Sequence, residues 1–191
     1  LAKKIVRARE ADIVLEKARA ISEFHDLEFV NFGGGPGVRY QENHPEFPLE
    51  RYAKETCQRV NESGIDFKAI CFEPGRYLVA DAGLLLVEVV DVKERYGDII
   101  AGVDSGFNHL IRPVMYGSYH EIINCSKAGD KPDEEVTIAG NLCETGDVFA
   151  VKRMLPKPEE GDILAIHNAG AYGFAMASRY NMRSLPKEVL L

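Results

Sequence analysis

The chain has 191 residues, 46% of them hydrophobic and 28% charged, which is the composition of a globular protein with one or two small domains. Its net charge of -7 argues against a nucleic-acid partner, and no apolar run is long enough to span a bilayer. The N-terminus also lacks the apolar segment of a signal peptide. These properties predict a cytoplasmic protein without membrane contact.

The first half of the chain predicts a helix, a strand, a second helix and a second strand. Residues 1–32 contain neither Gly nor Pro, and Val14, Ala18 and Ile21 share one helical face ahead of an apolar run at residues 27–32. A second helix is expected to begin at Leu49 and to stop before Gly64, and residues 67–72 are expected to form a short buried strand. In such a strand–helix–strand unit the two strands run parallel.

Beyond Gly83 the helical period gives way to short β-rich segments separated by turns. They lie at residues 84–92, 99–103, 136–139, 148–154 and 163–167. A small β-barrel or sandwich is predicted for this half, so the fold class is α/β followed by all-β. The last residues, 188–191, are apolar and predict a strand that is cut off, and Leu1 stands where Met is usual. We therefore expect both ends to be truncated.

Two polar motifs follow the two predicted parallel strands and are expected to lie on one rim of the sheet. Residues 33–37 read GGGPG, a bare backbone whose amides can approach a phosphate. The second motif is EPGR at residues 73–76, in which Arg76 can bind the same anion while the Glu73 carboxylate accepts from a nearby cation. Two plainer interpretations stay open, a tight barrel turn for the glycines and a type II turn for residues 73–76.

Further polar clusters interrupt the β pattern of the second half. A guanidinium at Arg112 and a phenol at Tyr116 can bind a carboxylate together, although a surface salt bridge beside a packed tyrosine is the alternative. Tyr172 can stack or hydrogen-bond in a site, or it can be a core tyrosine. The small residues at 174–180 are consistent with the start of a helix.

Residues 143–147, CETGD, place a thiol and two carboxylates in one loop between apolar strands. Cys143 can donate a proton or attack, and Glu144 can orient a cationic substrate, whereas the alternative is a strand-to-strand turn with an inert cysteine. The four cysteines form no CxxC or CxxH pair and are interpreted as free thiols: Cys57, Cys71, Cys125 and Cys143. No metal is predicted, because three histidines also lack ligand spacing and are interpreted as structural or surface residues: His109, His120 and His167.

Five motifs stand in one order along the chain: GGGPG, EPGRYLVADAG, DSGFNHLIRPVMYGSYH, NLCETGD and GAYGFAMASRYN. Together they resemble the C-terminal half of the diaminopimelate decarboxylase family, from residue 29 to the end of the chain. That family consists of pyridoxal-phosphate enzymes in which an alanine-racemase-like (β/α)8 barrel precedes a β domain. The resemblance implies that residues 1–83 form the last strands of the barrel and that residues 84–191 form most of the β-barrel or sandwich domain.

The resemblance also implies roles for individual residues. It assigns pyridoxal phosphate to Gly34, Gly35, Glu73, Pro74, Gly75, Arg76 and Tyr172, with Glu73 facing the pyridine nitrogen. The residues matching the substrate contacts are Arg76, Arg112, Tyr116, Glu144 and Tyr172, with Glu144 at the distal ammonium. Cys143 matches the proposed proton donor. The family further implies a homodimer in which the Cys-Glu loop enters the neighbouring subunit's site.

The activity that the resemblance implies is decarboxylation of meso-2,6-diaminopimelate to L-lysine, the last step of lysine biosynthesis. Pro36, Thr145 and Ser184 depart from common family residues in ways that look tolerable. The Schiff-base lysine of the family has no match here, since Lys3 and Lys4 sit on the first predicted helix. We therefore expect this chain to be a fragment of the enzyme, inactive when isolated.

Two alternatives remain open at the level of sequence. Related decarboxylases of the same fold act on ornithine, arginine or carboxynorspermidine, but they usually lack the pairing of Arg112 and Tyr116 with Glu144. A non-catalytic regulatory relative would keep the dimer surface alone, and its catalytic motifs would be expected to decay. The presence of Cys143 and Glu73 disfavours that second alternative.

Overall fold

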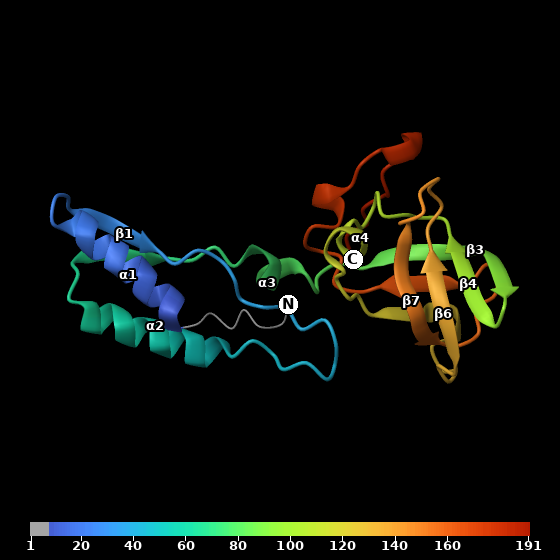
Figure 1. The fold of residues 1–191 in the computed structure, drawn as a ribbon, viewed down its shortest axis with the longest axis horizontal. Helices are drawn as coiled ribbons and strands as arrows, with labels where there is room; N and C mark the ends of the chain where they lie inside the picture. The colour runs from blue at the N-terminus through green and yellow to red at the C-terminus, as the bar shows by residue number, and fades with distance from the viewer. Residues whose placement is uncertain (1–7) are drawn as a thin grey trace. The chain divides into compact units, whose positions relative to one another are not determined.

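The computed structural model describes residues 8–191, with side chains from residue 11 onward, and divides into two compact units (Figure 1). The first unit is Leu1–Leu78 and the second is Val79–Leu191. The sequence places a domain boundary after residue 83, and that boundary stays a prediction. The α/β character of the first half and the all-β character of the second are both confirmed.

The first unit alternates helices with parallel strands. Its elements are α1 (Ala8–Ser22), β1 (Leu27–Asn31), α2 (Leu49–Ser63) and β2 (Phe67–Cys71), and α3 (Gly75–Val79) follows at its end. β1 pairs with β2 in parallel, with Leu27 opposite Phe67 and Asn31 opposite Cys71, as the strand–helix–strand pattern predicts. The expected stop of α2 is also confirmed, because Gly64 adopts the left-handed conformation (φ 62°) that glycine tolerates best.

Two expectations for the first unit are wrong in detail. The buried face of α1 carries Ala11, Leu15 and Ala18, while Ile21 is exposed, because this face packs against α2 and β1. β2 is mostly exposed and not buried, and Ile70 is accessible to solvent. The reason is that in the described residues β2 has one neighbouring strand, β1, so little of its surface is covered.

The second unit is a six-stranded sheet in the order β5-β8-β3-β4-β6-β7. Its elements are β3 (Leu85–Arg95), β4 (Asp98–Val103), α4 (Arg112–Tyr116), β5 (Ile122–Asn124), η1 (Cys125–Lys127), β6 (Glu134–Ala139), β7 (Val148–Leu155), β8 (Ile163–Ile166), η2 (Phe174–Met176) and η3 (Tyr180–Met182). All pairings are antiparallel except β4 with β6. The edge strands β5 and β7 contact each other, so the sheet curls into a nearly closed barrel.

Alternating side chains of this sheet form the core. On β3, Val87 and Val89 are buried and alternate with exposed Leu86, Glu88 and Val90, the period-2 pattern of a strand with one buried face. The other fully buried aliphatic side chains come from neighbouring strands and one loop: Val103, Leu110, Ile122, Val136, Ile138, Leu164 and Ile166. The sheet is thereby a rigid support for the loops at its ends.

Several local features of the second unit differ from the sequence-based expectations. The five β-rich segments are strands as expected, but β5 and the short helices α3 and α4 were not predicted. Residues 174–180 contain the short turn η2 and the first residue of η3 but no longer helix, since Gly173 and Ala177 adopt non-helical backbone angles. Residues 188–191 form no strand, because no neighbouring strand pairs with them and their apolar side chains are exposed.

Buried Asp162 ties the turn after β7 to the body of the second unit. Its Oδ2 accepts from Asn124 Nδ2 at 2.8 Å and from the Glu159 amide at 2.9 Å, and Lys127 Nζ lies 3.3 Å away. Burial raises the pKa of this carboxyl, but the hydrogen bonds and the lysine charge outweigh burial, so the net pKa lies below its ordinary value of 3.8.

Acid is therefore expected to weaken the second unit through Asp162. The pKa of Asp162 is lower in the folded than in the unfolded protein. Its carboxylate therefore contributes fully to the free energy of unfolding above the unfolded-state pKa, and this contribution is lost as the pH falls through the folded-state pKa. We expect the unfolding free energy to fall more steeply below about pH 4 in the native protein than in Asp162→Asn. Urea denaturation across pH 2.5–7 measures this (roughly the carboxyl range), with exposed Asp130→Asn as the control. Parallel profiles for native protein and Asp162→Asn would contradict it.

Candidate active site

The loops that follow β1 and β2 touch each other at one rim of the first unit. The Glu73 amide donates to the Gly33 carbonyl at 2.8 Å, so the expected adjacency of the two motifs is confirmed. A Cβ added to Gly34 would lie 2.4 Å from the Glu73 carbonyl oxygen, which no side chain can tolerate. Gly33 and Gly35 have φ of 70° and 116°. The glycines are therefore required by close packing and by backbone angles.

Asn31, the last residue of β1, fixes both motifs at once. Its Nδ2 donates to Glu73 Oε1 at 2.6 Å, and its Oδ1 accepts from the Gly33 amide at 2.8 Å. One side chain thus orients the Glu73 carboxylate and the first residue of the glycine loop. Sequence reasoning did not single out Asn31, although a polar residue at the end of a parallel strand is a usable signal.

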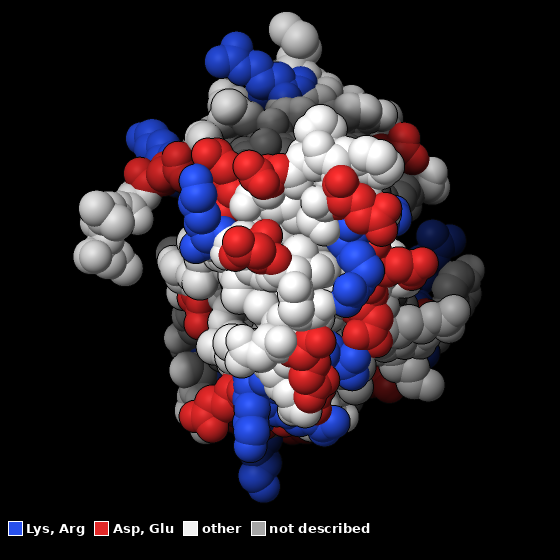
Figure 2. Space-filling view, turned by 90° about the vertical axis from the view of Figure 1, so that its left-hand side faces the viewer, with Lys and Arg blue, Asp and Glu red and all other residues white. Residues whose placement is uncertain are grey.

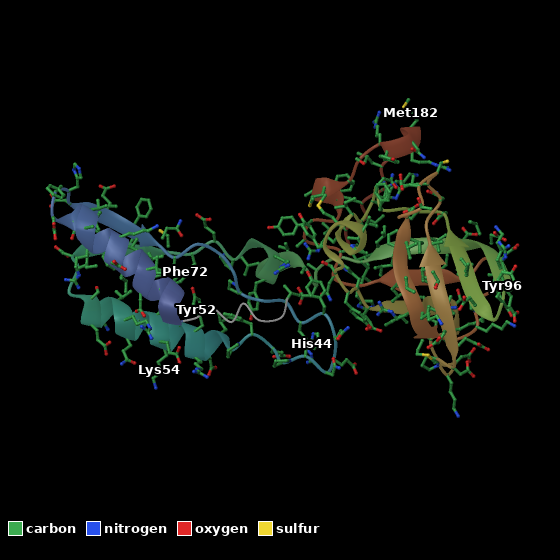
Figure 3. The ribbon with its side chains drawn as sticks, in the orientation of Figure 1. His44, Tyr52, Lys54, Phe72, Tyr96 and Met182 are labelled. Carbon is green, nitrogen blue, oxygen red and sulfur yellow. The ribbon has the colours of Figure 1, made fainter. Side chains whose placement is uncertain are left out.

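Aromatic side chains pack against the residues next to this rim. Phe72 stacks on Phe32 with ring centroids 5.7 Å apart, and Tyr52 of α2 meets Phe72 edge-on at 5.8 Å (Figure 3). Arg76, in the first turn of α3, lies with its guanidinium carbon 6.0 Å from the centroid of the Tyr40 ring. The predicted turn at Glu73–Arg76 is therefore a turn that opens a short helix.

The residues of this rim suit a ligand that carries both a cation and an anion. Glu73 offers a carboxylate to a protonated ring nitrogen, and the bare backbone of Gly34 and Gly35 offers close approach to a phosphate. Pyridoxal phosphate has these two groups. Neither loop of this rim contains a lysine, and Lys68, within β2, faces Glu28, with Nζ 3.9 Å from its Oε1.

In the second unit, Arg112 lies between two tyrosines. Its guanidinium carbon is 5.6 Å from the ring centroid of Tyr116 and 5.7 Å from that of Tyr172, and its Nη2 donates to Ser118 Oγ at 3.2 Å. Arg112 is 6% exposed, whereas both tyrosines are half exposed. Arg112 is therefore a buried and not a surface residue, and the half-exposed Tyr172 is not a core residue.

The loop that carries Tyr172 is tightly constrained. Tyr172 itself has φ of 59°, and a Cβ on Gly173 would lie 2.3 Å from the Ala169 carbonyl oxygen. A Cβ on Gly170 would lie 2.0 Å from the Val79 carbonyl oxygen. The GAYG sequence therefore holds the tyrosine ring in one place over Arg112.

His120 is a buried residue of the same unit and is 1% exposed. Its Nδ1 lies 2.8 Å from the His167 carbonyl oxygen, which can only accept, so Nδ1 carries the proton and donates. Burial lowers the pKa of His120, and the charges of Arg112 and Arg153 lower it further against the opposing effect of that hydrogen bond. The imidazole is therefore neutral at physiological pH and adds no charge beside Arg112, in agreement with the structural role expected for it.

Asp147 anchors the CETGD loop from inside the second unit. It is 4% exposed; its Oδ1 accepts from the Phe107 amide at 2.6 Å and its Oδ2 from the Leu142 amide at 2.8 Å. A Cβ on Gly106 or Gly140 would lie within 2.8 or 2.1 Å of Oδ2, so both glycines make room for the carboxylate. Sequence reasoning gave Asp147 no separate role, because its partner Phe107 lies 40 residues away along the chain.

Cys143 and Glu144 lie exposed in the loop that Asp147 holds. Glu144 Oε1 is 3.4 Å from the Gly146 amide and 3.4 Å from Thr145 Oγ1, which donate to it. Gly146 in turn approaches α4, since a Cβ there would meet Val114 at 3.8 Å. A thiol and an oriented carboxylate thus stand next to the helix that carries Arg112 and Tyr116.

Within residues 8–191 no cluster of three or more His, Cys, Asp or Glu side chains is arranged to hold a metal ion, and the four cysteines are free. No described helix combines the length and the apolar character that crossing a membrane requires. On the face shown in Figure 2, acidic and basic side chains are interspersed among uncharged ones.

Residues 22–170 match the family described as pyridoxal-dependent decarboxylase, C-terminal sheet domain, and the chain belongs to that family. A diaminopimelate decarboxylase of Methanothermobacter thermautotrophicus is 46% identical over 170 residues, which are 87% of this chain and 40% of that protein. The chain thus spans less than half the length of this curated relative.

Solved structures give the same result. A diaminopimelate decarboxylase structure matches 96% of this chain and 47% of its own with a TM-score of 0.83 at 37% identity. The M. jannaschii diaminopimelate decarboxylase in complex with L-lysine matches 94% of this chain and 42% of its own, with a TM-score of 0.80 at 40% identity. The resemblance of the five motifs to this family is confirmed.

Proposed function

We propose that this chain is part of a pyridoxal-phosphate-dependent decarboxylase that converts meso-2,6-diaminopimelate to L-lysine. The observation that carries the proposal is the cluster of Arg112, Tyr116 and Tyr172 beside the loop that exposes Cys143 and Glu144. The identity of 46% to a diaminopimelate decarboxylase supports the same substrate.

Pyridoxal phosphate, when bound, supplies the electron sink for the bond that breaks at the α-carbon. On this chain Glu73, oriented by Asn31, would hold the proton on the pyridine nitrogen. The backbone of Gly34 and Gly35, the Gly75 turn and Arg76 would bind the phosphate side, and Pro74 shapes the turn between them. Tyr172, in the second unit, would contact the substrate.

The substrate carries an amino-acid group at each end, so its recognition needs both signs of charge. In the second unit Arg112 and Tyr116 would bind a carboxylate, and Glu144 would bind the distal ammonium. The Cys143 thiol would then donate its Sγ proton to the α-carbon after carbon dioxide has left. Each of these groups is a residue type that can perform its step without a metal.

We also propose that the active enzyme is a cytosolic homodimer with shared sites. An exposed loop with Cys143 and Glu144 at its surface suits a contact with a second subunit's site. Free thiols suit a reducing compartment.

A second candidate is a decarboxylase of the same fold that acts on ornithine, arginine or carboxynorspermidine. Glu144 disfavours it, because a carboxylate near Arg112 and Tyr116 suits a substrate whose far end carries both an ammonium and a carboxylate group. A non-catalytic regulatory relative is disfavoured because the catalytic residue types are still present. Glu73 accepts from Asn31, Arg112 donates to Ser118, and the Cys143 thiol is exposed.

The test uses the enzyme encoded by the complete reading frame that contains this chain. We expect the absorbance of bound pyridoxal phosphate and carbon dioxide release from meso-diaminopimelate but not from ornithine. Preferential release from ornithine would overturn the assignment of diaminopimelate as the substrate. Binding of the cofactor without any carbon dioxide release would favour the regulatory relative.

In the same assay Cys143→Ala should lower kcat about 10²- to 10⁴-fold while cofactor absorbance is kept. Loss of the cofactor instead would assign Cys143 a structural role, and the exposed Cys125→Ala is the matched control.

A further inference from the structure

Residues 178–184, here called the tail segment, have no part in the chemistry described so far. They lie after η2 and include η3, whose last residue, Met182, is exposed and labelled in Figure 3. Residues 178–181 close the fifth motif, GAYGFAMASRYN, but the sequence assigns none of them a role. Their hydrogen bonds, however, run to the two loops that carry the substrate residues of the second unit.

Four hydrogen bonds fasten the tail segment. The Ser178 amide donates to the Asn108 carbonyl at 2.8 Å, and Asn108 Nδ2, on a side chain 1% exposed, donates back to the Ser178 carbonyl at 3.2 Å. Arg183 Nη2 donates to the Asn141 carbonyl at 3.1 Å, just before the CETGD loop. His109 Nε2 donates to the Ser184 carbonyl at 2.8 Å. The segment is therefore fixed at both of its ends.

Between these fixed points Tyr180 reaches Glu144. The Tyr180 ring packs on Phe107 with centroids 5.0 Å apart, and its hydroxyl donates to Glu144 Oε2 at 3.5 Å. The amide of the same Phe107 donates to Asp147. The residue that supports the Tyr180 ring is thus bonded to the aspartate that anchors the Glu144 loop.

We propose that Tyr180 is a positioning residue for Glu144, and that the tail segment thereby sets the preference for a substrate with a distal ammonium group. This inference rests on the proposed function, in which Glu144 binds that group. The loop's own donors hold Glu144 Oε1, and Tyr180 holds Oε2. A neutral phenol orients the carboxylate and leaves its charge for the ligand, which a lysine or an arginine would not do.

The 3.5 Å separation is long for an O–H···O hydrogen bond. Such contacts tighten when the ligand is bound, because the ammonium draws the carboxylate into one orientation. The hydroxyl is therefore expected to matter most for binding of the substrate and less for the chemical step, which takes place at the other end of the molecule.

The experiment compares Tyr180→Phe with the native enzyme encoded by the complete reading frame. Removing the hydroxyl should raise KM for meso-diaminopimelate about three- to tenfold and change kcat less than about twofold, the signature of lost substrate binding. Tyr96→Phe, at a tyrosine 93% exposed in the β3–β4 turn, should change neither constant. In a Glu144→Ala background, Tyr180→Phe should add no further rise in KM.

An equal rise in KM with and without Glu144, or a fall in kcat alone, would overturn the positioning role. Melting temperatures of the native enzyme, Tyr180→Phe, Glu144→Ala and the double variant test the contact without any substrate. If the native enzyme does not decarboxylate diaminopimelate, the proposed function fails and these temperatures decide the positioning alone. A Tyr180→Phe effect on melting that depends on Glu144 then supports it, and an effect independent of Glu144 overturns it.

Discussion

Asp147→Asn is expected to lower the unfolding free energy of the second unit by about 2–4 kcal/mol. The native carboxylate accepts from two buried backbone amides, at Phe107 and Leu142. An asparagine in its place has one acceptor oxygen, so its NH2 group would face one of the two N–H donors and leave that amide unsatisfied. Chemical denaturation measures the loss, and Asp133→Asn, at an exposed turn position, is the matched control.

The same substitution is expected to reduce turnover beyond its effect on folding. Cys143 and Glu144 lie between Leu142 and Asp147, so releasing one amide frees the loop that presents both groups. A displacement of about 1 Å can cost a hundredfold in rate. Steady-state assays below the unfolding transition measure it. Full activity in a destabilised Asp147→Asn enzyme would show that the anchor serves stability alone.

Gly34→Ala is expected to weaken cofactor binding at least about tenfold. The added methyl group would lie 2.4 Å from the Glu73 carbonyl oxygen, and this contact can only be relieved by separating the two loops. Separation would break the Glu73-to-Gly33 hydrogen bond and turn the Glu73 carboxylate away from Asn31. Spectrophotometric titration of the enzyme from the complete reading frame with pyridoxal phosphate measures the affinity.

Gly37→Ala supplies a matched control within the same loop. In the part of the chain that the structure describes, nothing lies within 4 Å of a Cβ at Gly37, and Gly37 has no positive φ. Its substitution should leave the affinity within about twofold of native (less than 0.5 kcal/mol, as for an unconstrained surface position). Equal affinities for Gly34→Ala and Gly37→Ala would mean that the loop contact does not govern cofactor binding.

The sequence predicted most of the regular structure because its signals are local. The alternation at Val87 and Val89 marks a strand, and Gly64 marks the end of α2. Parallel pairing of β1 with β2 followed from the helix between them, and it correctly brought Glu73 to the glycine loop. The helices α3 and α4 were missed because Pro-Gly and Arg-Pro dipeptides favour turns as well as helix starts.

Residues that act through distant partners were harder to predict. Asn31 contacts Glu73 across the rim, Asp147 bonds to Phe107, and Tyr180 reaches Glu144, each pair widely separated in sequence. No periodicity or spacing reveals such contacts. Exposure of Ile70 and of residues 188–191 was also unpredictable, because an apolar run does not show whether a neighbour covers it.

The parallel pairing of β4 with β6 has a consequence for how the second unit folds. Residues 104–133 connect these two strands, and they contain α4 with Arg112 and Tyr116. This long crossover must close before the two strands can pair, so it adds sequence-distant contacts that slow folding. Refolding of this unit should therefore be slow, and it should depend on the crossover that carries the substrate-binding helix. Natural selection for a foldable barrel and for a working site then acts on the same stretch of chain.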